Sequence, residues 1–179
     1  MSISTAKGDD GTTGLFYGGR VRKDSPRPEA YGQVDEAQAS IGVARAHLSP
    51  GSEHDVLLVS IERDLYVVMA ELATDPANHH KLTPGTSLVT PEMVERLGAE
   101  LVAIEEWLPM PTEFVIPGGS VVSAHLDVAR TVVRRAERDA VVVCTSSSHV
   151  LPYLNRLSSL LWAQARWVEG EHLLSRDVT

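Results

Sequence analysis

The chain has 179 residues, a length that fits one domain (residues 1–179) with a substantial hydrophobic core. Acidic residues (24) outnumber basic ones (16), and the resulting net charge of −8 argues against general binding to nucleic acid or to anionic membranes. The single cysteine, Cys144, excludes an internal disulfide, and without a signal segment or a long apolar run we expect a soluble cytoplasmic protein with no membrane contact.

Residues 1–28 differ from the rest of the chain because glycines recur among polar residues without a helical period. Such a segment is often a disordered tail. The alternative is a loop whose backbone N–H groups bind phosphate oxygens, since glycine lets the backbone approach a ligand closely. Arg20, Arg22 and Lys23 follow and favour an anion, although the segment lacks the Gly-Lys-Ser/Thr ending of a Walker A loop.

Helical signals fill most of the remaining chain. Ser52 and Ser120 can each cap a helix, and Thr90 followed by Pro91 is a strong helix start. The predicted helices cover residues 29–48, 52–74, 90–107, 120–143 and 152–174, with a polar loop at 75–90. Because no β-strand pattern of useful length appears, we predict an all-α, five-helix up-and-down bundle over residues 29–174.

The fourth predicted helix carries four arginines within nine residues. At about 100° per residue, Arg130, Arg134 and Arg138 share one stripe with Glu137 beside them, whereas Arg135 points further round. A stripe of like charges needs anionic partners. These can be acidic neighbours on a solvated surface, or a bound phosphate or carboxylate, which suits the guanidinium group.

Other polar residues allow more than one interpretation. Asp35 and Glu36 can complement the dipole of the first helix, pair with the arginine stripe, or position a metal. Asn155 lies among leucines on the fifth helix and needs a hydrogen-bond partner if it faces inward, such as an adenine or a ribose. Three tryptophans favour a core or interface role over a stacking platform: Trp107, Trp162 and Trp167.

Six motifs occur in order along nearly the whole chain. They are Thr5-x-x-Gly8-Asp9-x-Gly11-x-Thr13-x-Leu15, Gly19-Arg20-x-x-Lys23, Tyr31-Gly32-x-Val34-Asp35-Glu36, Phe114-Val115-Ile116-Pro117-Gly118-Gly119, Ala129-Arg130-x-x-x-Arg134-Arg135-Ala136-Glu137-Arg138 and Tyr153-Leu154-Asn155-Arg156-Leu157-Ser158. Together they resemble the PduO-type ATP:cob(I)alamin adenosyltransferases, or corrinoid adenosyltransferases. Each motif alone is weak, but six in the family's order are specific.

The resemblance implies a homotrimer of five-helix bundles with active sites between subunits. It implies binding of ATP by Thr5, Ala6, Lys7, Gly8, Thr13, Gly14 and Lys23 in the glycine-rich segment, and by Arg134, Arg135, Ala136, Glu137, Arg138 and Asn155 on the helices. Catalytic roles are implied for Arg134, Phe114, Asp35 and Arg130, with Phe114 beneath the corrin and the last two at the subunit boundary. Mg²⁺ is expected mainly on the ATP phosphates, with Glu137 as a candidate side chain.

One departure affects the glycine-rich segment. Family members usually carry a basic residue directly after the threonine and a hydroxyl before the glycine, whereas this chain has Ala6 and Lys7 there. Gly14 also stands where a serine is common. The backbone contacts to phosphate survive such changes, but the side-chain contacts differ.

The implied reaction transfers the 5′-deoxyadenosyl group of ATP to the cobalt of cob(I)alamin and releases triphosphate. The implied partners are a cobalamin reductase or flavoprotein electron donor and an adenosylcobalamin-dependent acceptor enzyme. The alternative is a module that binds ATP or adenosylcobalamin without catalysis, for delivery or sensing.

Overall fold

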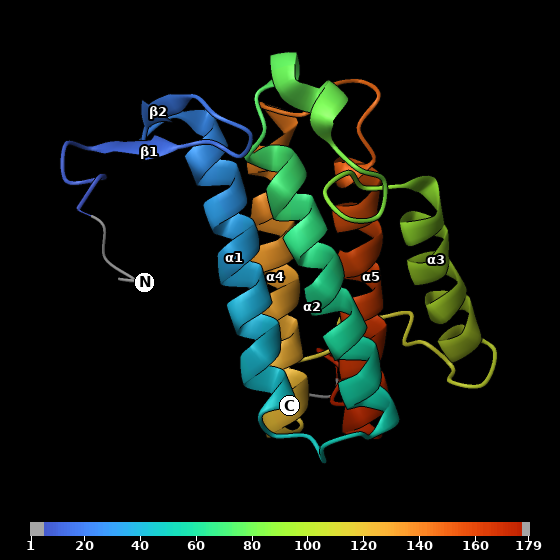
Figure 1. Ribbon diagram of the computed structural model, residues 1–179. Coiled ribbons are helices and arrows are strands. Elements are labelled where there is room, and N and C mark those ends of the chain that lie inside the picture. Colours follow the sequence, from blue (N-terminus) through green and yellow to red (C-terminus); the bar gives the residue numbers. More distant parts are fainter. Residues whose placement is uncertain (1–5, 177–179) are drawn as a thin grey trace.

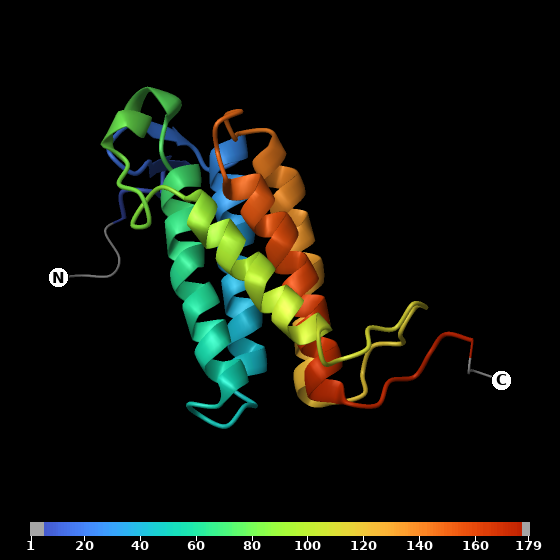
Figure 2. The ribbon, with the colours of Figure 1, turned by 90° about the vertical axis from the view of Figure 1, so that its right-hand side faces the viewer.

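Four long helices form a bundle in the computed structural model, which describes residues 6–176 (Figure 1). They are α1 (Pro26–Arg45), α2 (Glu53–Leu72), α4 (Val121–Val141) and α5 (Val150–Glu169). A shorter helix, α3 (Pro91–Glu105), packs against α5, and Figure 2 shows it slanting across that helix. Within the described residues, the predicted count of five α-helices and their order are confirmed.

The core of the bundle combines small and branched side chains. α4 is buried at Leu126, Ala129, Val133, Ala136 and Ala140, which are spaced by three and four residues along one face. Alanines are also buried on the facing side of α1, so these two helices can approach closely. Polar side chains on the opposite face of α4 are therefore held on a rigid support.

Side-chain capping sets the starts of two of the five α-helices in the described part of the chain, α2 and α4. The Ser52 hydroxyl accepts a hydrogen bond from the N–H of Asp55 at 3.3 Å. Ser120 and Ser123 form a reciprocal capping box at the start of α4, with both hydrogen bonds at 3.0 Å. α1 begins at Pro26, earlier than predicted, because proline is favoured in the first turn of a helix.

The end of α5 was predicted too late. The helix stops at Glu169 because Gly170 adopts a left-handed conformation with φ of 74°. Beyond it, Leu174 pairs with Val115 in an antiparallel bridge. The C-terminal segment therefore supports the loop before α4 instead of extending α5.

Two short structures also depart from the prediction. β1 (Thr12–Gly14) and β2 (Arg20–Arg22) form an antiparallel pair in the glycine-rich segment, where no strand was expected. The polar loop after α2 contains a 3₁₀-helix, η1 (Pro76–Lys81). Within residues 6–176, none of the helices combines the length and the apolar character needed to cross a bilayer.

Candidate active site

The glycine-rich segment folds into a tight loop around Lys23. The N–H of Gly11 donates to the carbonyl of Gly8, and the N–H of Lys23 donates to the carbonyl of Gly11 at 2.9 Å. A Cβ added to Gly8 would lie 3.1 Å from the Lys23 ammonium nitrogen and 3.2 Å from the Thr12 carbonyl oxygen, so a larger residue would crowd the loop. Gly11 has φ of 78°, which favours glycine.

Arg20 stabilises this loop through hydrogen bonds, whereas the Lys23 side chain has no ion-pair partner among the described residues. Arg20 donates to the carbonyl of Lys7 at 2.6 Å and to the hydroxyl of Thr12 at 3.1 Å. Hydrogen bonds from Thr12 also lower the pKa of Asp10. The ammonium of Lys23 makes no ion pair within residues 6–176 and is available to an anion.

The other predicted residues of this segment have different positions. Ala6 has φ of 55°, a left-handed conformation at the start of the loop. Thr13 and Gly14 belong to β1, opposite Val21 and Arg20. A Cβ at Gly14 would meet no atom within 4 Å, so the position has room for the serine that is common in the family. Thr5 lies outside the described residues.

The arginines of α4 face different neighbours. Arg135 turns toward α1, where it pairs with Glu36 at 2.5 Å, and this contact raises the pKa of Arg135. Arg134 and Arg138 are exposed, and Arg138 donates to the carbonyl of Arg134 at 3.0 Å. The predicted separation of Arg135 from the stripe is confirmed, whereas the acid of α1 pairs with Arg135 and not with an arginine of the stripe.

Glu137 and Asn155 meet across α4 and α5. The Asn155 amide donates to the Glu137 carboxylate at 3.1 Å, and Asn155 is exposed rather than turned into the core. Ala136 is fully buried in the core, so its side chain has a packing role.

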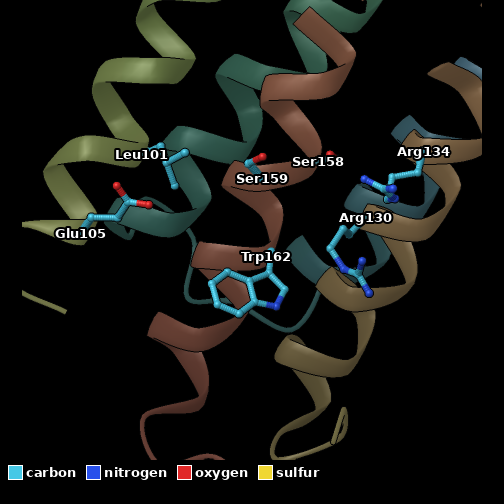
Figure 3. A pocket seen from close by; sticks show the side chains of 7 residues that line it. All are labelled: Leu101, Glu105, Arg130, Arg134, Ser158, Ser159 and Trp162. Carbon is cyan, nitrogen blue, oxygen red and sulfur yellow. The ribbon is translucent and has the colours of Figure 1, made fainter. Parts of the chain in front are cut away.

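Arg130 and Arg134 line a cavity of about 370 Å³ between α3, α4 and α5. Figure 3 shows Trp162 between Glu105 of α3 and Arg130 of α4, with Arg134 further along α4. The remaining lining residues are Leu101, Ser158 and Ser159. The cavity thus combines two guanidinium groups, the Glu105 carboxylate, hydroxyls and an indole ring.

A second cavity of about 350 Å³ adjoins the first and holds Phe114. Arg130 and Trp162 line both cavities. Phe114 is 86% exposed, although its backbone is fixed because its carbonyl accepts from the N–H of Ser175 at 2.9 Å. An exposed phenylalanine on an ordered backbone offers apolar area to a ligand.

Sequence reasoning missed most of the residues that line these cavities, and three of them are central to the arrangement. Trp162 was expected in a core or an interface, but it forms the wall that the cavities share. Asp127 and Arg166 line the Phe114 cavity although both are buried. The only sequence signal for Arg166 was a charge at a core-facing position of a leucine-rich helix.

The predicted residues form two groups in one chain. Arg130, Arg134, Phe114 and Asn155 lie on or beside α4 and α5, whereas the glycine-rich loop lies beside the start of α1 (Figure 1). Asp35 is exposed on α1. Within the described residues, no hydrogen bond or ion pair joins the loop to Arg134, Glu137 or Asn155.

Comparisons with known proteins give a consistent result. A corrinoid adenosyltransferase of Mycobacterium tuberculosis is 43% identical over 169 residues, covering 92% of this chain and 86% of that protein. A corrinoid adenosyltransferase of Bacillus subtilis is 40% identical over 177 residues, covering 95% of this chain and 88% of that protein. The structure of a variant PduO-type ATP:corrinoid adenosyltransferase from Lactobacillus reuteri, complexed with cobalamin and ATP, superposes with a TM-score of 0.87 at 28% identity and covers 98% of this chain and 97% of that one. The family model for cobalamin adenosyltransferases matches residues 3–168, and this chain therefore belongs to the cobalamin adenosyltransferase family.

Proposed function

We propose that the protein transfers the 5′-deoxyadenosyl group of ATP to the cobalt of cob(I)alamin, giving adenosylcobalamin and triphosphate. The observation that carries this proposal is the pair of adjoining cavities, one lined by Arg130 and Arg134 and the other by Phe114. The first has the donors that a polyphosphate needs, and the second has the apolar surface that a corrin face needs. Because Arg130 and Trp162 line both, the two substrates can meet there.

The chemistry needs no nucleophile from the protein. The Co(I) electron pair attacks C5′ of ATP, the bond from C5′ to the phosphate oxygen breaks with its electrons, and triphosphate leaves. The tasks of the protein are to align cobalt with C5′ and to stabilise the growing negative charge. We assign the second task to Arg134 and Arg138, which are exposed and carry no ion pair within residues 6–176.

The nucleotide site is proposed to form between two subunits of a homotrimer. Lys23 and the backbone of its loop are ready to bind phosphate, but they make no contact with Arg134 or Asn155 of the same chain. A neighbouring subunit can bring its loop to the α4–α5 face and complete the site. We assign exposed Asp35 to the same boundary, where it would face Arg130 of a neighbour.

Mg²⁺ is proposed to bind chiefly through the ATP phosphates. Among the described residues, no three His, Cys, Asp or Glu side chains cluster in a way that could hold a metal ion. One carboxylate plus substrate phosphates is a common donor set for Mg²⁺, and Glu137 lies beside the arginines of α4. When bound, the ion would neutralise phosphate charge, while Asn155 fixes the Glu137 carboxylate.

Phe114 is proposed to cover the lower face of the corrin. Its exposed ring would exclude water and the lower axial ligand from cobalt. Loss of that ligand makes Co(II) easier to reduce, because electron density no longer enters along the axis. A reductase or flavoprotein would then supply the electron, and an adenosylcobalamin-dependent enzyme would accept the product.

The test is incubation of the protein with ATP, Mg²⁺ and chemically reduced cobalamin. We expect the absorption spectrum of adenosylcobalamin to appear together with an equal amount of free triphosphate. Binding of ATP without either product would refute the proposed reaction and favour the binding module for delivery or sensing.

A further inference from the structure

Arg166 is a buried charge with no role in the reaction described above. It lies on α5, is 1% exposed, and is among the largest fully buried side chains in the protein. Its guanidinium group pairs with Asp127 of α4 at 2.7 Å and with Glu169 of α5 at 2.9 Å. Burying ions costs several kcal/mol each, and apolar residues often stabilise such a position as well or better. A contribution to folding stability alone therefore does not explain why three charged residues are buried here.

One arm of this cluster leads to Arg130. The second carboxylate oxygen of Asp127 accepts from Nε of Arg130 at 3.3 Å. Arg130 lines both cavities, so its position affects the nucleotide side and the Phe114 side together. One carboxylate oxygen of Asp127 therefore contacts Arg166, and the other contacts Arg130.

The other arm leads to the Phe114 loop. Glu169 accepts a hydrogen bond from the N–H of Gly119 at 3.1 Å, at the end of the turn that links Phe114 to α4. A Cβ at Gly119 would overlap the Glu169 carboxylate, so glycine is required for this approach. The turn therefore has a position built to receive the carboxylate that Arg166 contacts.

We propose that Arg166 is a positioning residue that fixes Arg130 and the Phe114 loop relative to each other. Arg166 also lines the Phe114 cavity, where its guanidinium carbon lies 5.9 Å from the centre of the Trp162 ring. By fixing both groups, Arg166 would set the position of the corrin ring relative to the bound nucleotide. The inference rests on the proposed function, since it specifies how the same site aligns its substrates. A misplacement of about 1 Å can cost on the order of 100-fold in rate.

The test compares Arg166→Lys with a matched control, Arg45→Lys. Arg45 likewise bridges two carboxylates, of Asp55 at 3.0 Å and Glu62 at 2.5 Å, but it lines neither cavity. Lysine keeps the charge in both variants but cannot span two carboxylates with a rigid fork. Both are expected to lose thermal stability.

Of these two lysine variants, only Arg166→Lys is expected to change the binding and coordination of the corrinoid. We expect its KM for cob(I)alamin to rise about tenfold and its fraction of four-coordinate Co(II)cobalamin to fall by about half, with the KM for ATP within about twofold of wild type. Equal kinetics in the two lysine variants, or a parallel rise of both KM values, would overturn the proposal.

A second variant, Glu169→Gln, keeps the test decisive if Arg166→Lys does not fold. It removes one charge of the cluster but retains an oxygen for Gly119. We expect a smaller loss of the four-coordinate fraction in this variant, and an unchanged fraction would contradict the proposal. Wild-type protein in the same assay separates the two hypotheses. If it forms no adenosylcobalamin, the proposed reaction fails, whereas the corrinoid spectra still report on Arg166.

Discussion

The glycine-rich loop and the α4–α5 face are built in opposite ways. The loop depends on short-range backbone hydrogen bonds and on glycines, and it projects beside the start of α1 (Figure 1). The α4–α5 face has its exposed side chains on helices whose other side is the core. The loop places Lys23 next to a short strand pair, whereas the α4–α5 face places cationic and apolar side chains on packed helices. Substitutions in each region can test this difference.

The largest expected effect is that of Arg134→Ala. Arg134 is exposed, and its side chain makes no hydrogen bond or ion pair within residues 6–176, although its backbone carbonyl accepts a hydrogen bond from Arg138. Loss of its side chain should leave the fold intact but remove a donor to the leaving triphosphate, which costs about 10²–10³-fold in kcat. Turnover at saturating ATP measures the effect. Arg63→Ala, an exposed arginine on α2, is the control and should keep full activity.

Mixed oligomers test whether the two regions meet between subunits. Lys23→Ala damages the loop, and Arg134→Ala damages the α4–α5 face, so each variant alone should be nearly inactive. If a site combines the two regions from different chains, random co-assembly at equal amounts restores about a quarter of the sites. Activity of the mixture that stays at the level of the separate variants would show that each site lies within one chain.

Phe114→Ala should change the coordination of the bound corrinoid without changing ATP binding. The side chain is 86% exposed, so its removal costs little stability. We expect the fraction of four-coordinate Co(II)cobalamin to fall severalfold while ATP affinity is unchanged. Tyr66→Ala removes another exposed aromatic ring, from α2, and should change neither quantity. Equal spectra for the two variants would remove Phe114 from the corrin site.

The helices were predictable because their signals are local. Ser52 and Ser120 cap the helices that follow them, and the buried positions of α4 repeat with the helical period. The end of α5 was missed because Gly170 falls within an otherwise helical stretch, and because the pairing of Leu174 with Val115 joins distant parts of the chain.

The site was predictable only in part, for the same reason. Motif order indicated Arg134 and Phe114, but it contained no information on the contact of Arg166 with Asp127, which are 39 positions apart. The role of Trp162 also depends on α3, α4 and α5 coming together around one cavity. Spacing along one helix cannot specify such a contact.

The smallest expected effect separates two glycines of the N-terminal loop. Gly8→Ala would press a methyl group against Lys23 and the carbonyl of Thr12, whereas Gly14→Ala meets no atom within 4 Å. We therefore expect Gly8→Ala to raise the KM for ATP severalfold, with kcat and thermal stability nearly unchanged, because the loop is exposed and supports no core. Gly14→Ala should behave as wild type. Equal KM values in the two variants would mean that the close approach of Lys23 to Gly8 does not shape the phosphate site.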